Sequence, residues 1–169
     1  MLRAAITALR PRLDAASVRC VLEGFDLPAP LLGNQVQLRI ACGNLLVNSL
    51  EALDGCPPPQ RRILVRLERS GATSLTLLVA DSGPGLQGRS LRSLSLASSK
   101  SEGMGLGLFT TALIAEQHHG SLAAGASSEL GGAELRLVLP CLPPSPQPQL
   151  SSERSRSDAV TPPAPVQRR

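Results

Sequence analysis

Three short stretches occur in a fixed order along this chain, and together they constrain its fold more than any other feature. Residues 44–48 read Asn-Leu-Leu-Val-Asn, residues 81–85 read Asp-Ser-Gly-Pro-Gly, and residues 103–108 read Gly-Met-Gly-Leu-Gly-Leu. The first places two carboxamides on one face of a helix, because side chains four residues apart lie one above the other. The second places a carboxylate before a glycine turn, and the third is a glycine-rich loop that opens a helix. Together they offer the groups that a magnesium-bound nucleotide requires.

The two carboxamides, Asn44 and Asn48, stand among apolar residues of their predicted helix. A buried amide without a partner costs about 1–3 kcal/mol, so both side chains need a hydrogen bond or a ligand. A carboxamide oxygen suits Mg2+, which usually keeps several waters and takes phosphate oxygens as further ligands. The alternative is that both side chains cap nearby backbone groups or bind water.

The carboxylate of Asp81 ends a nearly continuous apolar run, residues 74–80, and precedes Gly83 and Gly85. A buried carboxylate at a strand end can accept a hydrogen bond from an exocyclic amine such as that of adenine. The glycines would let the backbone pass close to a flat ring. An ordinary Asp-Ser-Gly turn is the alternative.

The glycine-rich stretch, residues 103–108, opens a predicted helix. Free N–H groups and the positive end of the helix dipole favour an anionic phosphate there. The stretch is not a Walker loop, because no Gly-Lys-Ser/Thr follows, and it lacks the preceding strand of a Rossmann fingerprint. The only lysine of the chain, Lys100, lies in the loop before it and could reach a terminal phosphate. A solvated loop lysine is the alternative.

Hydrophobic periodicity and capping signals predict the elements that carry these stretches. Helices are expected over residues 2–16, 34–53 and 104–118, with Asn34 as the N-cap of the second. Strands are expected over residues 18–23, 62–69, 74–80, 121–126 and 132–139. The last two strands form a hairpin turned at Gly131-Gly132. Residues 82–102 read as a loop, within which residues 91–96 favour a helical turn.

Composition excludes several classes of protein. The chain has 169 residues, enough for one domain with a sizeable core. Aromatic content is 1%, so there is no stacking platform for single-stranded nucleic acid, and a net charge of +4 is too weak a bias to predict a nucleic-acid or membrane partner. No apolar run approaches the ~20 residues of a membrane span. Four cysteines without zinc spacing predict reduced thiols in a cytoplasmic protein.

The composition also changes sharply near residue 140. We therefore expect a folded domain over residues 1–140. Residues 141–169 are rich in Pro, Ser, Gln and Arg, and are predicted to form a disordered tail.

The ordered motifs Asn-Leu-Leu-x-Asn, Asp-x-Gly-x-Gly, Ser-Ser-Lys and Gly-x-Gly-Leu-Gly-Leu resemble the catalytic ATP-binding domain of sensor histidine kinases. That domain belongs to the superfamily of the gyrase, heat-shock chaperone and mismatch-repair ATPases. The resemblance spans residues 1–140 and includes residues 33–38, 116–120 and 131–135. It implies the Bergerat fold, an α/β (α+β) two-layer sandwich whose mixed sheet is covered on one face by three helices. It also implies ATP and Mg2+ as cofactors.

The resemblance assigns a role to each motif. Asp81 would bind the amino group of adenine, and Gly83 and Gly85 would shape the base pocket. Asn48 would ligate magnesium and Asn44 would assist at the phosphates. Lys100 would act from the lid, residues 86–102. The phosphate-side positions would be Gly103, Gly105, Leu106, Gly107 and Leu108.

The amide of Asn44 separates branches of this superfamily. The ATP-hydrolysing branches, and the serine kinases that act on anti-sigma partners, typically carry Glu there, which can polarise an attacking water or hydroxyl. An amide cannot act as a general base. It fits phosphoryl transfer to an imidazole, where catalysis would rest on positioning and charge neutralisation. We therefore expect a histidine kinase component of a two-component phosphorelay. A non-catalytic ATP- or ADP-binding regulatory module is the alternative, and slow ATP hydrolysis a third.

Three departures from the family pattern bear on partners. The family's phosphoacceptor histidine lies on a helical hairpin ahead of this domain, and we expect none in this chain, since His118 and His119 align with a structural His-Gly-Gly segment. The expected partners are a histidine-containing dimerisation domain or protein and, indirectly, a response regulator. The lid segment, residues 91–97, lacks the family's Phe, which motivates the non-catalytic alternative. Ser121 replaces a glycine, a minor change.

Overall fold

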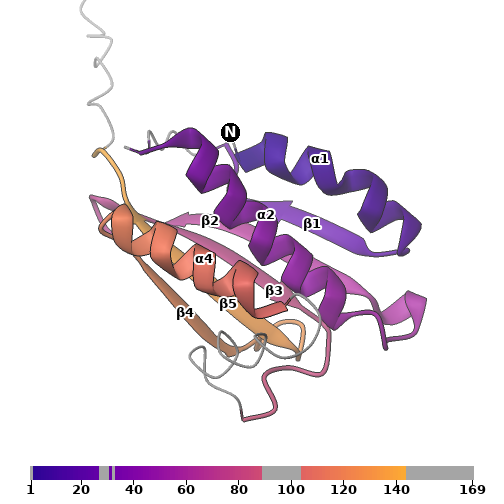
Figure 1. Ribbon diagram of the computed structural model, residues 1–169. Helices are drawn as coiled ribbons and strands as arrows, with labels where there is room; N and C mark the ends of the chain where they lie inside the picture. Colours follow the sequence, from indigo (N-terminus) through magenta and orange to yellow (C-terminus); the bar gives the residue numbers. More distant parts are fainter. Residues whose placement is uncertain (1, 27–30, 32, 89–103, 144–169) are drawn as a thin grey trace, which may run out of the picture.

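The computed structural model describes residues 2–26, 31, 33–88 and 104–143 as one α/β unit (Figure 1). Its helices are α1 (Leu2–Ala15), α2 (Gln35–Ala52), the short 3-10 helix η1 (Pro58–Gln60) and α4 (Met104–Gln117). Its strands are β1 (Arg19–Glu23), β2 (Arg62–Arg69), β3 (Ser74–Asp81), β4 (Ser121–Ala126) and β5 (Ala133–Pro140). The bounds agree with those predicted to within two residues, and among the described residues only η1 is an addition.

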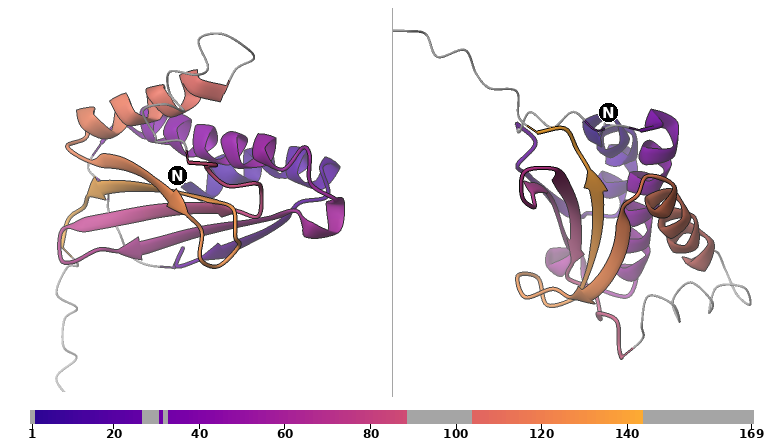
Figure 2. Two further views of the ribbon diagram at one scale, coloured as in Figure 1. Left: turned by 90° about the horizontal axis from the view of Figure 1, so that it is seen from below. Right: turned by 90° about the vertical axis from the view of Figure 1, so that its left-hand side faces the viewer.

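The strands form one five-stranded sheet in the order β1-β2-β3-β5-β4. The β1–β2 pair is parallel and the other pairs are antiparallel, so the sheet is mixed. Helices α1, α2 and α4 lie on one face, and no described helix covers the other (Figure 2). The predicted fold class, a mixed sheet under three helices, is confirmed.

The alternation of side chains along the central strands explains this layering. On β3, Leu77 and Val79 point to the helices and join the main core, whereas Leu78 and Ala80 point to the open face and join a separate small cluster. Successive strand residues face opposite sides, so one strand feeds both clusters. The side chain of Asp81, two residues after Val79, therefore enters the helix-covered face.

The long central helix α2 is fixed at its N-terminus by three hydrogen bonds of Asn34. The Asn34 side chain accepts hydrogen bonds from the N–H groups of Val36 and Gln37, at 2.9 and 3.3 Å, as its predicted role of N-cap requires. The Asn34 N–H donates to Nε2 of His118 at 3.0 Å, and Nδ1 of that ring contacts the Ile114 carbonyl at 2.7 Å. His118 therefore ties the end of α4 to the start of α2, which is the structural role expected of it.

The described residues continue past the predicted domain boundary at residue 140. Cys141 is buried, donates its N–H to the Thr73 carbonyl at 2.8 Å and forms an isolated bridge with Leu31. The folded part thus includes Cys141. Residues 144–169 lie outside the described residues, as do residues 91–96, so the disordered tail and the helical turn in the loop stay predictions.

Candidate nucleotide-binding site

Asp81 is the centre of the candidate site. It ends β3 with 1% of its surface exposed. Its Oδ1 accepts hydrogen bonds from the N–H of Gly83 at 2.9 Å and from the N–H of Ala133 at 3.2 Å. These two bonds fix the carboxyl plane from the following turn and from the start of β5.

The second oxygen of this carboxyl, Oδ2, is buried and has no hydrogen-bond partner among the described residues. The hydroxyl of Ser49, on α2, is also buried without a hydrogen-bond partner among the described residues, and it faces the same carboxyl. A buried acceptor without a donor costs free energy, so the pair is prepared to receive a donor from outside the chain. An exocyclic amine of a purine is such a donor, and this geometry fits the adenine role predicted for Asp81.

The pKa of the Asp81 carboxyl is raised, chiefly because burial disfavours its charged form. The hydrogen bonds from the N–H groups of Gly83 and Ala133 oppose this rise of the pKa. The nearby Ser49 hydroxyl opposes it more weakly, because it lies close to the carboxyl without a hydrogen bond of ordinary geometry. The opposing donors act on a carboxylate, so they favour the ionised form that a ligand amine requires.

The glycines around Asp81 allow close approach of the backbone. A Cβ on Gly83 would lie 2.9 Å from the Ala52 carbonyl oxygen and 3.0 Å from Asp81 Oδ1. Gly85 has φ +73°, a left-handed conformation that side chains disfavour. These observations explain why both positions are glycine, and their role in shaping a base pocket stays a prediction.

The amide of Asn44 reaches across to α4. Its Nδ2 donates to the Gly107 carbonyl at 3.1 Å, and the Thr111 hydroxyl donates to the same carbonyl at 2.8 Å. A Cβ on Gly107 would lie 3.5 Å from Asn44 Cβ, so the two helices are in contact there. Asn44 therefore forms the backbone contact that the sequence left open as an alternative, and it holds the first turn of α4 against α2.

The other predicted site residues are brought together only in part. Asn48 is half-buried one turn after Asn44 on α2. Gly105 and Gly107 belong to α4 itself, so this part of the stretch is the first helical turn and not a preceding loop. Leu106 is 69% exposed, whereas Leu108 is a core residue at 1%. Lys100 and Gly103 lie outside the described residues.

The sequence reasoning missed three groups at the site. Ser49 carried a signal, since it is a hydroxyl in an apolar stretch directly after Asn48. Gly132 was assigned only to a hairpin turn, yet its N–H donates to the Asp81 carbonyl oxygen at 3.1 Å. The N–H of Ala133 carries no sequence signal, because every residue except proline offers one.

The described part of the chain holds no cluster of three or more His, Cys, Asp or Glu side chains able to bind a metal. A magnesium ion held by one carboxamide, waters and phosphates needs no such cluster. Within the same residues, no helix is both long and apolar enough to span a membrane. The four cysteines are all free thiols.

A mixed sheet under three helices, with a buried carboxylate at the end of β3 and two carboxamides one turn apart on α2, is typical of a nucleotide-binding α/β sandwich. Residues 33–143 match the family described as histidine kinase-, DNA gyrase B- and HSP90-like ATPases, and the chain belongs to this family. Membership of an ATPase family implies that the domain uses ATP.

The relatives are sensor kinases. The chain is 41% identical over 137 residues to the C4-dicarboxylate transport sensor protein DctS of Rhodobacter capsulatus, covering 80% of this chain and 20% of the relative. It is 32% identical over 123 residues to the sensor histidine kinase TmoS of Ectopseudomonas mendocina, covering 71% of this chain and 12% of the relative. The chain thus spans about a fifth or less of these relatives, and it is homologous to the catalytic domains of sensor histidine kinases.

Solved structures agree on the fold. The ATP-binding domain of PrrB from Mycobacterium tuberculosis has a TM-score of 0.57 and 25% identity, with 85% of this chain and 90% of that chain covered. The catalytic domain of histidine kinase ThkA has a TM-score of 0.72 and 18% identity, with 84% and 91% covered.

Proposed function

We propose that this domain binds Mg-ATP and transfers the γ-phosphate to a histidine on a separate dimerisation hairpin, from which a response regulator would receive it. The imidazole nitrogen attacks the γ-phosphorus, the bond to the β,γ-bridging oxygen breaks, and ADP leaves. One observation carries the proposal: the family's general-base position holds Asn44, whose amide already donates to the Gly107 carbonyl. It offers no base to activate water, and an imidazole nucleophile needs none.

The proposal gives each described site residue a task. Asp81 accepts a hydrogen bond from the adenine amine, with Ser49 beside its free oxygen. Asn48 would be the protein ligand of Mg2+, which would supply neutralisation of the negative charge on the phosphates. Lys100 enters from the sequence alone, as a cation for the terminal phosphate.

The phosphate side of the site would be formed by the first turn of α4. Gly105, Leu106 and Gly107 contribute its backbone, with Gly103 ahead of it. Leu108 anchors this turn in the core. The positive end of the α4 dipole then faces the phosphates. An ATP-using domain with free thiols suits the cytoplasm, which we propose as its location.

Incubation with labelled ATP, Mg2+ and a histidine-hairpin protein tests the transfer. We expect label on the hairpin histidine, and its loss in Asn48→Ala. Gln37→Ala is the matched control, because Gln37 is a carboxamide on the same helix that pairs with Gln117 at 2.9 Å, away from Asp81. ATP binding without transfer to any hairpin protein would support the non-catalytic module instead. Steady phosphate release that Asn48→Ala abolishes would support hydrolysis.

A further inference from the structure

The turn between β4 and β5, residues 127–132, is a unit closed by its own hydrogen bonds. The Ser127 N–H donates to the Gly132 carbonyl at 2.8 Å, and the Gly131 N–H donates to the Ser127 carbonyl at 3.0 Å. The Leu130 N–H donates to the Ser127 hydroxyl at 3.0 Å, and Ser127 is 4% exposed. A turn closed at both ends and across its middle moves as one body, so a force on its tip reaches its base.

The base of this turn rests on Asp81. The Gly132 N–H donates to the Asp81 backbone carbonyl, and the next N–H, that of Ala133, donates to Asp81 Oδ1. Asp81 Oδ1 and the Gly83 nitrogen lie so near that a Cβ on Gly132 would be 2.5 and 2.6 Å from them. A displacement of the turn therefore changes the orientation of the carboxyl group.

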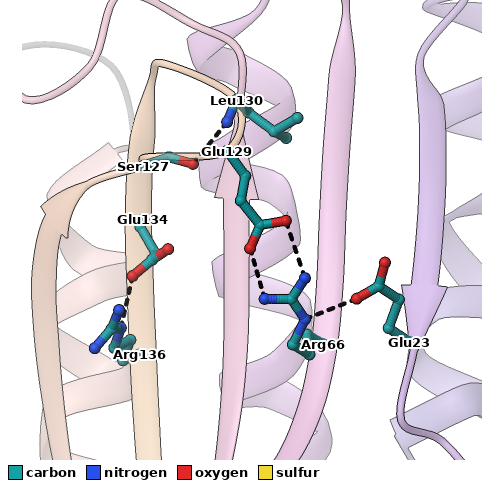
Figure 3. Close-up of polar contacts among 7 residues, drawn as sticks. All are labelled: Glu23, Arg66, Ser127, Glu129, Leu130, Glu134 and Arg136. Atoms are coloured by element: carbon teal, nitrogen blue, oxygen red, sulfur yellow. Dashed lines mark hydrogen bonds and ion pairs between the residues drawn. The ribbon is translucent and has the colours of Figure 1, made fainter.

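The tip of the turn is clasped onto the open face of the sheet by Arg66 (Figure 3). Its Nη1 and Nη2 bind the two carboxylate oxygens of Glu129 at 2.6 and 2.9 Å, and its Nε binds Glu23 at 2.7 Å. A two-pronged guanidinium–carboxylate bond fixes direction as well as distance. Leu130 packs beside this clasp on the small cluster of Leu64, Leu78 and Ala80.

We propose that Arg66 and Glu129 are positioning residues for nucleotide recognition, which act through the turn on the carboxyl of Asp81. The inference deepens the proposed function and rests on it, because Asp81 is the group proposed to read the adenine amine. Neither residue touches the nucleotide. Their clasp lies on the open face of the sheet, and Asp81 faces the helices.

The size of the effect follows from the exposure of the clasp. The Arg66 side chain is 27% exposed and those of Glu23 and Glu129 are 45% exposed, so the clasp contributes little to global stability. Its local effect is on the position of the Ala133 N–H. Loss of the clasp should therefore weaken only the interaction that Asp81 makes, while the phosphate contacts persist.

Two triphosphates separate the interaction of Asp81 from the phosphate contacts: ATP, and purine riboside triphosphate, which lacks the exocyclic amine. Kd for both would be measured with the purified full chain and Mg2+. We expect Arg66→Met to raise Kd for ATP about threefold, a scale typical of a partly exposed charge pair, and to leave Kd for purine riboside triphosphate unchanged. Glu129→Gln should have the same effect, and the double variant should equal either single variant. Arg66→Lys, which keeps the charge without the fork, should fall between wild type and Arg66→Met.

Arg136→Met is the matched control. Arg136 lies on the same open face and pairs with Glu134 of its own strand at 2.6 Å, whereas Arg66 pairs with Glu129 of the turn (Figure 3). It should change neither Kd. Equal losses for both triphosphates in Arg66→Met, or no loss for either, would overturn the inference.

Hydrogen exchange keeps the clasp testable independently of nucleotide. We expect Arg66→Met to speed exchange of the Ala133 amide with little change in the melting temperature, and Arg136→Met to leave that amide unchanged. If the wild-type chain bound no ATP, the proposed function would fail. The positioning of Asp81 by the clasp would then be judged on this exchange rate alone, and an unchanged rate would overturn it.

Discussion

The two faces of the central sheet are built on different physical terms, although the same strands supply both. The helix-covered face carries the main apolar core, to which all three helices contribute. Among the residues that the structure describes, the buried apolar cluster of the open face consists of Leu64, Leu78 and Ala80, with Leu130 packed against it. Partly exposed ion pairs of Arg66 and Arg136 lie on this face, which no described helix covers.

This contrast indicates that different parts of the molecule determine its stability and its recognition of the nucleotide. The helix face supplies most of the apolar burial, which is the dominant favourable term in folding. Asp81 draws on both faces: its side chain enters the helix layer beside Ser49, and the turn that reaches over the open face holds it in place. Changes on the helix face should therefore alter stability, and changes at the turn should alter recognition more than stability.

The sharpest test of the two faces uses neighbouring residues of β3. Leu77 and Leu78 are 2% and 3% exposed, and they point to opposite faces. Leu77→Ala should reduce the free energy of unfolding by about 3–4 kcal/mol, and Leu78→Ala by about 2 kcal/mol. The second loss is smaller because Leu78 has fewer apolar neighbours to lose and because the cavity it leaves can close. Urea unfolding measures both values. Equal losses would show that the open face is packed as firmly as the helix face.

The next prediction separates recognition from folding at Asp81. Asp81→Asn should weaken ATP binding by about 1.5–3 kcal/mol. The substitution replaces the charged carboxylate oxygen, which accepts a hydrogen bond, by an amide N–H2 group, so that two donors face each other at the adenine amine. Asn Oδ1 can still accept from Gly83 and Ala133, and its amino group can donate to Ser49. Calorimetric titration with ATP and thermal melting without it measure the two effects. Unchanged ATP affinity would count against the assigned pocket, and a collapse of the melting temperature would show that the carboxylate is structural.

Gly132 is where the turn meets Asp81, and a larger residue there should affect both stability and ATP binding. A Cβ at Gly132 would lie 2.5 Å from Asp81 Oδ1, closer than packed atoms approach. Gly132→Ala should therefore cost about 1–3 kcal/mol of stability and weaken ATP binding as well. Gly125→Ala on β4, where a Cβ meets open space, is the control and should be nearly neutral. Denaturation and ATP titration of both variants measure the difference, and similar effects in the two would rule out the contact as the cause.

The smallest expected effect is a pH dependence of opposite sign at two carboxyls. Burial raises the pKa of Asp81 above its ordinary 3.8, so its contribution to stability is present below that value and is lost as the pH rises through the raised pKa. The hydrogen bond from Arg66 lowers the pKa of Glu129 below its ordinary 4.5, so its contribution is present above 4.5 and is lost as the pH falls through the lowered pKa.

Melting temperatures from about pH 2.5 to about pH 7, where carboxyl groups titrate, measure the contributions of both carboxyls to stability. Asp81→Asn should remove a loss of stability that accompanies rising pH, and Glu129→Gln should remove a smaller loss that accompanies falling pH. Identical profiles for the two variants would contradict the assignment of these shifts.

The sequence by itself determined the layers of this protein. The positions of Leu75, Leu77 and Val79, and the capping residue Asn34, set the elements through periodicity and local hydrogen bonding. The order of the motifs likewise determined the class of fold and placed Asp81 at the end of an apolar strand. These properties depend on residues close in the chain, so they can be read from it.

Only the tertiary structure decided what surrounds Asp81 and what Asn44 binds. Ser49, Ala133 and Gly132 reach Asp81 from segments 32 to 52 residues away, through a helix and a hairpin turn that must first pack on opposite sides of the strand. The hydrogen bond from Asn44 to the Gly107 carbonyl exists only because the fold places α4 beside α2, and the phosphate role of Asn44 stays a prediction. Arg66 gave no signal in the sequence, because an arginine on an alternating strand becomes a clasp only when a distant turn brings Glu129 to it.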